Sequence, residues 1–218
     1  SSVLNNKNIL ITGGTGSFGH QMILELMQYK PKLIRIFSRD EDKQHNLKQE
    51  FLESPILDKI QSINTKHRPI WLKIGQDLSK EQLDDIIYLS KKYKVDAIIA
   101  SNLAKDKTKL NLKSSNKNKL GGISGKPTRD KSNKIIAYLY KYSEGKYKII
   151  GTGGIFSGHD AYKKIKAGAN LVQLITGLIY NGPTAVNIIN KQLENLIQHD
   201  NFKHISEAVG IESDQYTL

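Results

Sequence analysis

The sequence of 218 residues contains no cysteine. Disulfide bonds, thiolate-bound metals and a cysteine nucleophile are therefore excluded, because each of them needs a thiol. The six histidines also lack paired metal-ligand spacing and a nearby acidic cluster, so no metal site is expected. Any oxidation–reduction chemistry would have to come from a bound organic cofactor.

Long apolar runs are missing as well. None approaches the roughly 18 residues that a membrane helix needs, and residues 1–5 lack the charged-then-apolar pattern of a secretory signal. The sequence therefore predicts a cytoplasmic protein. With 38% hydrophobic residues, the chain can build one large α/β domain or two small ones.

Arginine is scarce although the chain is strongly basic. The formal net charge is +12, yet the arginines are limited to Arg35, Arg39, Arg68 and Arg129. The lysines are spread along the chain without an arginine-and-aromatic platform for bases, so no specific nucleic-acid partner is expected. Lysines concentrate at 105–119, which predicts a solvated loop; attraction of a phosphate is the alternative.

Short β-branched or leucine-rich runs alternate with amphipathic stretches, a pattern typical of parallel strands joined by helices. The predicted strands are 8–12, 33–37, 70–74, 95–100, 148–151 and 171–175. The predicted helices are 18–29, 41–52, 80–93, 131–142, 160–167 and 184–198. The predicted fold class is therefore α/β with parallel strands and about six βα units, fewer than the eight of a closed (βα)8 barrel.

A glycine-rich loop follows the first predicted strand, with Gly13, Gly16 and Gly19 in the spacing GxxGxxG. Between a strand and a helix, such a loop lets the backbone approach a pyrophosphate. The second predicted strand ends at Ser38 and Arg39, where an arginine suits the 2′-phosphate of NADP. The pattern predicts a Rossmann-like dinucleotide site.

Residues 8–52 resemble the nucleotide-sugar 4,6-dehydratases that act on UDP-N-acetylglucosamine, through ILITGGTGSFG at 9–19 and FSRDE at 37–41. The resemblance implies an NADP site made by Gly13, Thr15, Gly16, Ser17, Phe18, Gly19, Ser38 and Arg39. Three pairs match the YxxxK spacing of that family: Tyr88/Lys92, Tyr142/Lys146 and Tyr162/Lys166. Three matches in so lysine-rich a chain indicate chance rather than a site.

Two further glycine clusters, at 121–125 and 151–155, precede predicted helices, and a strand-like run at 171–177 ends at Gly177. Exposed backbone N–H groups in such clusters can hold a phosphate, although a single cluster is equally a tight turn. The strands that end near Gly151 and Gly177 are expected to be adjacent and parallel, as in the terminal phosphate site of many barrels.

From about residue 56 to 212 the chain resembles the second half of dihydroorotate dehydrogenase, closest to the quinone-reducing class. The matching stretches are KIGQDLS at 73–79, IASN at 99–102, GGISGKP at 121–127, IIGTGGIFSG at 149–158, AGANLVQL at 167–174 and SEAVG at 206–210. This implies half of a (βα)8 TIM barrel over residues 55–218, joined to a dinucleotide-binding segment over residues 1–54. The implied activity is oxidation of dihydroorotate to orotate, a step of pyrimidine biosynthesis.

The second resemblance also implies FMN as the cofactor and assigns residues to it. Lys73 would lie beside the flavin ring, and Asn102 would bind the orotate ring. Leu103 and Ile175 replace a family threonine and tyrosine, which removes polar contacts to substrate and cofactor. The implied FMN-binding residues are Lys73, Ser101, Gly125, Gly153, Gly154, Ile175 and Thr176, and the implied substrate-binding residues are Asn102 and Leu103.

The first four strand–helix units of that family, including the loop whose serine removes the substrate proton, have no counterpart in this sequence. No catalytic residue is therefore assigned, and intact catalysis is not expected. Three hypotheses remain: an FMN flavoprotein with little or no turnover, an NADP-binding module of nucleotide-sugar metabolism, and a non-enzymatic chimera. Because an incomplete barrel exposes strand edges, a homodimer is a further expectation.

Overall fold

The computed structural model describes residues 8–12, 29, 33–37, 55–108, 110, 112 and 120–218. Its strands are β1 (Asn8–Thr12), β2 (Leu33–Phe37), β3 (Trp71–Lys73), β4 (Ala97–Ala100), β5 (Lys148–Thr152) and β6 (Leu171–Gln173). Its α-helices are α3 (Pro55–Ile63), α4 (Lys80–Lys92), α5 (Arg129–Ser143), α6 (Gly158–Ala167), α7 (Thr176–Asn181) and α8 (Ala185–His199). Short 3-10 helices are η2 (Lys126–Thr128), η3 (Ile205–Ala208) and η4 (Ser213–Gln215).

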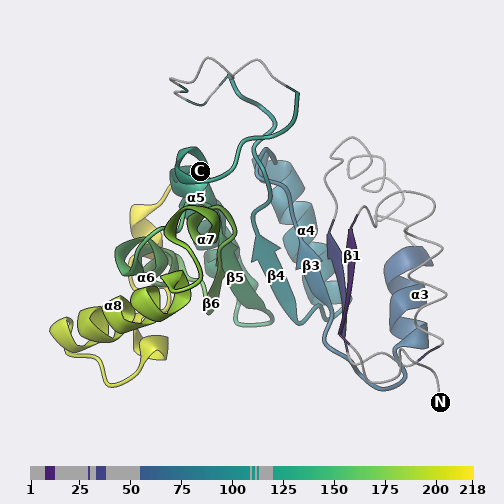
Figure 1. Cartoon of the computed structure of the whole chain (residues 1–218). Coiled ribbons are helices and arrows are strands. Elements are labelled where there is room, and N and C mark those ends of the chain that lie inside the picture. Colours follow the sequence, from purple (N-terminus) through teal and green to yellow (C-terminus); the bar gives the residue numbers. More distant parts are fainter. Residues whose placement is uncertain are drawn as a thin grey trace.

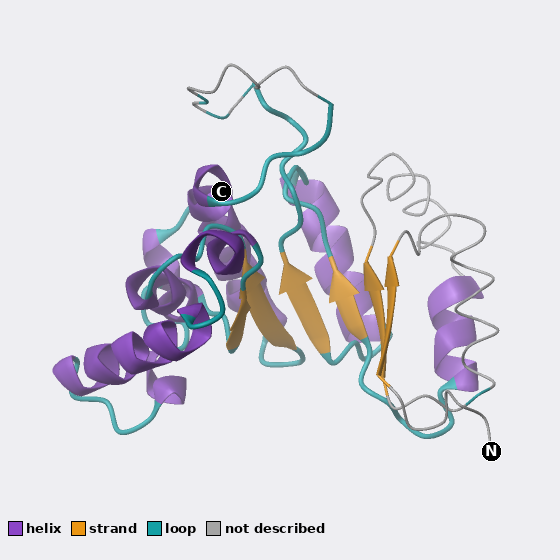
Figure 2. Cartoon of the chain, in the orientation of Figure 1, coloured by secondary structure: helices purple, strands orange, loops and turns teal. Residues whose placement is uncertain are grey.

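All described strand pairs are parallel. β1 pairs with β2, and β3, β4, β5 and β6 form a four-stranded sheet in the order of the sequence. The arrowheads in Figure 2 accordingly point the same way. Helices α4, α5 and α6 make the successive crossovers between the four strands (Figure 1). The α/β class with parallel strands is confirmed, and neighbours in sequence order are typical of an arc of a (βα)8 barrel.

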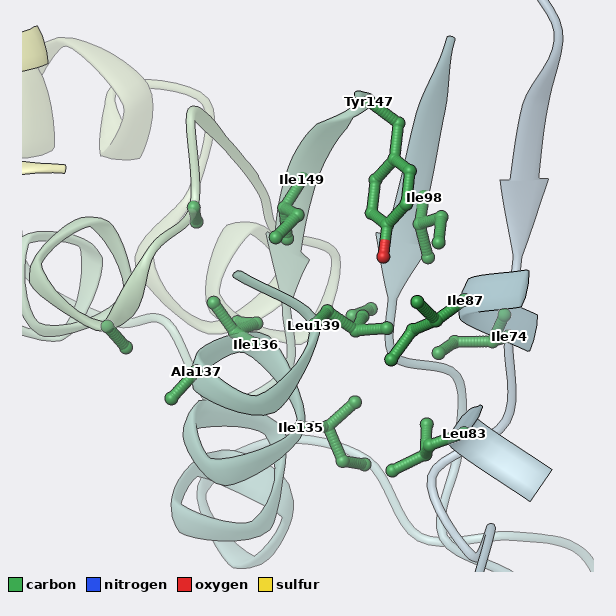
Figure 3. Close-up of a cluster of buried hydrophobic side chains, with 13 residues drawn as sticks. Ile74, Leu83, Ile87, Ile98, Ile135, Ile136, Ala137, Leu139, Tyr147 and Ile149 are labelled. Atoms are coloured by element: carbon green, nitrogen blue, oxygen red, sulfur yellow. The ribbon is translucent and has the colours of Figure 1, made fainter. Parts of the chain in front are cut away.

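The largest core lies between the sheet and the helices α4 and α5. Figure 3 shows Leu83 and Ile87 of α4 facing Ile135 and Leu139 of α5, with Ile98 of β4 beside them. Leu83, Ile135 and Leu139 are fully buried. Removing such a side chain to alanine typically costs about 2–5 kcal/mol, so this layer fixes the sheet against its helices.

The opposite face of the sheet is buried too. Ala97, Ile99 and Ile150 form a second cluster, and Trp71 packs against it. Because side chains alternate along a strand, Lys73 shares this face with Trp71, as the sequence predicted. Burial on both faces of a parallel sheet is expected where one face meets helices and the other lines a barrel interior.

The structure adds two helices that the sequence analysis missed. Helix α3 begins at Pro55, which had been interpreted only as a segment boundary, and its Leu57 packs against Leu89 and Tyr93. Proline is favoured at a first helical position because its missing N–H would have no partner there. Helix α7 begins at Thr176, where only a glycine turn was expected. The predicted strand ends differ from the observed ones by up to two residues.

The predicted helices 18–29 and 41–52 lie outside the described residues, apart from Tyr29. The division of the chain at residues 54 and 55 stays a prediction. No helix in the described part of the chain has both the length and the apolarity needed to cross a membrane.

Candidate functional site

The carboxyl ends of the four strands bring the predicted site residues to one edge of the sheet. Lys73 is the last residue of β3, Ser101 follows β4, and Gly153 follows β5. Thr176 opens α7, shortly after β6. Parallel strands end at the same edge, which is where barrel enzymes carry their sites.

Two hydrogen bonds connect the loops at this edge. The Thr152 hydroxyl donates to the carbonyl of Ser101 at 2.6 Å and joins the ends of β5 and β4. The Thr176 hydroxyl donates to Ser124 Oγ at 3.0 Å. A Cβ atom built on Gly125 would lie 3.1 Å from Thr176 Cγ2. The glycine cluster 121–125 and the start of α7 are therefore in contact, although 51 residues separate Gly125 from Thr176.

The loop after β5 approaches the start of α5 very closely. Gly154 has a φ of +70°, and a Cβ atom on it would lie 2.5 Å from Arg129 Cβ. A side chain at this position would push α5 away, so only glycine fits. Gly177 is as constrained, because its Cβ atom would lie 2.0 Å from the carbonyl oxygen of Ile155. The backbone at this corner is thus packed to fixed positions around the predicted phosphate site.

An ion pair that the sequence analysis missed supports this corner from outside. Arg129 Nη1 donates to Asp160 Oδ1 at 2.9 Å, which joins the first turns of α5 and α6. Asp160 also accepts from Phe156 N at 3.0 Å and from Ser157 Oγ at 3.1 Å. Although burial opposes the charge, these hydrogen bonds lower the pKa of Asp160 below its ordinary value. Ser157 three residues before Asp160 is a helix N-cap signal that could have pointed to it.

A buried polar group behind β5 was also missed. Lys164 of α6 has no exposed surface, and its Nζ donates to Ser132 Oγ at 3.0 Å and to Asn133 Oδ1 at 2.9 Å. Burial lowers the pKa of Lys164 to about 7. The signal was available, because Ala161 and Ile165 place Lys164 on the apolar stripe of a predicted helix.

The predicted substrate residues lie in the segment after β4. The Asn102 N–H donates to the carbonyl of Ile74 at 3.0 Å, and Ala104 pairs with Ile123 in an antiparallel bridge. Asn102 and Leu103 are half-buried. Leu103 packs against Gly122, where a Cβ atom would lie only 2.7 Å from Leu103 Cβ. The structure therefore places both residues between the β3 end and the cluster 121–125.

The cation Lys73 and the residue Ile175 occupy the two ends of the candidate site. Lys73 is half-buried, and burial lowers the pKa of its ammonium group. Ile175 has a side chain 64% exposed and precedes α7 without capping it. The roles of these residues toward a ligand stay predictions.

The predicted NADP site falls outside the described residues, since it consists of Gly13, Thr15, Gly16, Ser17, Phe18, Gly19, Ser38 and Arg39. Of the three tyrosine–lysine pairs, Tyr162/Lys166 belongs to packing, because Tyr162 is buried and donates to Asp200 at 2.8 Å. No group of His, Cys, Asp and Glu among the described residues could hold a metal ion.

Comparison with known proteins identifies the chain over most of its length. A model of the dihydroorotate dehydrogenase family matches residues 24–197. Dihydroorotate dehydrogenase (quinone) of Crocosphaera subtropica is 42% identical over 163 residues, which cover 72% of this chain and 43% of that protein. The enzyme of the same name from Christiangramia forsetii is 34% identical over 208 residues, 86% of this chain and 59% of the relative.

Solved structures agree with these matches. The crystal structure of ligand-free dihydroorotate dehydrogenase from Eimeria tenella superimposes with a TM-score of 0.68 at 29% identity, over 72% of this chain and 48% of that one. A second structure of the Eimeria tenella protein, in complex with ferulenol, has a TM-score of 0.66 at 26% identity. The match covers 83% of this chain and 62% of that one. The chain thus spans about half the length of the proteins that it matches.

These comparisons also limit the interpretation of the N-terminal segment. The family match begins at residue 24, inside the segment 8–52 that resembles the dehydratases. None of the comparisons supports a fused dehydratase segment, and the Rossmann, NADP and chimera expectations gain no support from them. The family match over residues 24–197 and the relatives together show that the chain belongs to the dihydroorotate dehydrogenase family.

Proposed function

We propose that this chain is the flavin-binding part of a dihydroorotate dehydrogenase and holds FMN at the carboxyl edge of β3–β6. The observation that carries the proposal is the convergence there of Lys73, Asn102 and Thr176 with two glycine clusters. The residues fit the cofactor, because both clusters hold glycines with positive φ, the kind of loop whose backbone N–H groups bind phosphate. Bound FMN would supply the two-electron chemistry that this cysteine-free chain lacks.

The phosphate end of FMN belongs at the corner formed by Gly153, Gly154 and Thr176. Backbone N–H groups of glycines in such loops bind phosphate oxygens, and the Thr176 hydroxyl, which donates to Ser124 here, can turn its one hydrogen to the phosphate instead. The contact of Gly125 with Thr176 places the cluster 121–125 against the same corner. Ile175 can contribute only its backbone, so the phosphate depends on its neighbours.

The ring end of FMN belongs near Lys73 and Ser101. Lys73 presents a cation at the end of β3, where a positive charge favours negative charge on a reduced flavin ring. Asn102 carries both a donor and an acceptor for an edge of orotate, and its backbone is held by Ile74. Leu103 offers neither, so substrate binding relies on Asn102.

Titration of the purified protein with FMN, followed by flavin fluorescence, tests the proposal. In Gly154→Asp the new side chain would collide with Arg129 and displace the loop whose backbone N–H groups would bind the phosphate, so FMN binding is expected to weaken at least tenfold, about 1.4 kcal/mol. Gly145→Asp is the matched control, because Gly145 also has a positive φ but a Cβ atom there meets nothing within 4 Å. Thr176→Val, which removes one hydroxyl, serves if Gly154→Asp does not fold.

Two results would contradict the proposal. One is the absence of titratable FMN binding at high micromolar concentration. The other is equal affinity of the unaltered protein, Gly154→Asp and Thr176→Val for FMN. Loss of binding in Gly145→Asp as well would show that the effect of Gly154→Asp comes from the added charge or the positive φ rather than from the phosphate corner.

A second candidate is NADP binding at residues 13–19 and 38–39, favoured by the register of β1 and β2. Thr12 and Phe37 face each other at the ends of these parallel strands, so the segments after them leave from the same edge. Arg39 would pair with the 2′-phosphate. Calorimetry should then show preference for NADP over NAD, abolished in Arg39→Ala; equal affinities in the unaltered protein would refute it. A chain that binds neither FMN nor NADP would favour the non-enzymatic chimera.

A further inference from the structure

We propose that Lys164 is a positioning residue of the phosphate corner, which fixes the Thr152–Gly153 peptide through Ser132. The inference rests on the proposed FMN function and deepens it. Lys164 lies on α6, behind the sheet, and contacts neither of the glycine clusters through its charge-bearing atom. Its action is transmitted by hydrogen bonds.

The chain of hydrogen bonds starts at the ammonium group. Lys164 Nζ donates to Ser132 Oγ at 3.0 Å, and the Ser132 hydroxyl donates onward to the carbonyl oxygen of Thr152. Since the hydroxyl has one hydrogen, accepting from Lys164 leaves that hydrogen for Thr152. A second bond, from Nζ to Asn133 Oδ1 at 2.9 Å, keeps the ammonium group in place.

The direction of the Thr152 carbonyl fixes the direction of the Gly153 N–H, the group that would meet the phosphate. This carbonyl and the N–H of Gly153 belong to one planar peptide unit and point in opposite directions. Holding the oxygen toward Ser132 therefore aims the N–H away from it. Gly153 has a φ of +94°, and glycine is conformationally free, so its peptide needs such a restraint to keep one orientation.

The composition of the Lys164 environment argues against a purely space-filling role. A buried ammonium is costly, and an apolar side chain of similar length would fill the same volume without that cost. The charged groups that influence Lys164 are Asp160 on α6 and Asp130 and Arg129 on α5. Burial lowers the pKa of Lys164 to about 7, the two carboxylates favour the charged amine and Arg129 opposes it, so the amine carries its positive charge behind the phosphate corner below about pH 7.

Comparison of FMN with riboflavin isolates the effect, because riboflavin lacks only the phosphate. Lys164→Met and Ser132→Ala are each expected to weaken FMN binding about tenfold and to leave riboflavin binding unchanged. Lys163→Met is the matched control, since Lys163 is the next residue on α6 but is exposed. It is expected to bind both flavins like the unaltered protein. Ser132→Ala keeps the test decisive if Lys164→Met does not fold.

The pH dependence gives a readout that a merely structural lysine would not move. The ratio of FMN affinities, unaltered protein over Lys164→Met, should be larger at about pH 6 than at about pH 8, because a phosphate favours protonated Lys164. Titration of the FMN phosphate itself cancels in this ratio.

The possible failures are distinguishable. If the unaltered protein does not bind FMN, the proposed function is refuted and the inference falls with it. If FMN binds but Lys164→Met and Ser132→Ala match the unaltered protein, only the inference is overturned. Equal losses for FMN and riboflavin would also overturn it, because they indicate a general loss of structure.

Discussion

At the scale of single residues, Lys164 is the largest fully buried side chain among the described residues, and it carries a titratable amine. Burial lowers its pKa from 10.5 to about 7 in the folded protein. Between these values the unfolded chain holds a proton that the folded chain has released. The free energy of unfolding contributed by Lys164 therefore increases as pH rises from about 7 to about 10.5, and below about 7 it is constant.

Lys164→Met should remove this pH dependence. Denaturant titrations at about pH 7 and pH 10 are expected to show that the unaltered protein gains on the order of a few kcal/mol relative to the variant at the higher pH. The exposed control Lys163→Met should follow the unaltered protein at both values. A difference between the unaltered protein and Lys164→Met that does not change with pH would contradict the assignment.

At the scale of elements, the first turns of α5 and α6 are joined by the bond from Arg129 to Asp160. The carboxylate is nearly buried and accepts from three groups, so its loss leaves several donors unpaired. Asp160→Asn is expected to lower the free energy of unfolding by about 1–3 kcal/mol. Asp130→Asn is the matched control, because Asp130 is exposed and its contact with Arg129 Nε is longer, at 3.4 Å.

The pH dependence of this effect has a definite sign. Hydrogen bonds to the charged form lower the pKa of Asp160 in the folded state, so its contribution is present above the unfolded value of 3.8. This contribution is lost as the pH falls from 3.8 through the lower pKa that Asp160 has in the folded protein. The difference between the unaltered protein and Asp160→Asn should therefore shrink below about pH 4, as measured by urea titration. A difference that grows on acidification would show that another group dominates.

The elements also show how far the sequence predicts this fold. Isoleucine-rich runs identified β1 and β2 with the observed ends, because strand periodicity survives in short segments. Helix α7 was missed because the sequence shows Gly177 only as a turn signal. In the structure this glycine is required by its close approach to the carbonyl oxygen of Ile155, which the sequence alone does not reveal. The convergence of Gly125 and Thr176 followed from the order of parallel strands. Local patterns indicated the burial of Lys164 and the capped start of α6, but the bonds of Lys164 to Ser132 and of Arg129 to Asp160 depend on contacts between helices, which no local pattern encodes.

At the scale of the whole molecule, the chain covers about half of its relatives, which bears on turnover. Breaking the substrate C–H bonds requires a positioned base and a positioned flavin, each worth orders of magnitude in rate. The family resemblance implies a serine-bearing loop as the base, and none of the residues that the structure describes is assigned that role. Anaerobic mixing of the FMN-loaded 218-residue chain with dihydroorotate is therefore expected to bleach the flavin slowly. Rapid bleaching that is lost in Lys73→Ala would reveal a surrogate base.

The outer strand of the sheet points to self-association. β6 pairs only with β5 among the described strands, and large apolar side chains around it are exposed, with Leu171 at 57%, Ile175 at 64% and Ile179 at 74%. A strand that lacks a second partner strand among the described residues, beside exposed apolar side chains, favours pairing with another chain, and a second copy is always present at the same concentration. Light scattering at micromolar concentration should therefore report twice the chain mass of 24.5 kDa.

Ile179→Lys should shift the mass toward the monomer, whereas Tyr88→Lys, at an exposed position on α4, should not. A monomer mass for the unaltered protein at all concentrations would refute the dimer, and a dimer that persists in Ile179→Lys would place its interface elsewhere.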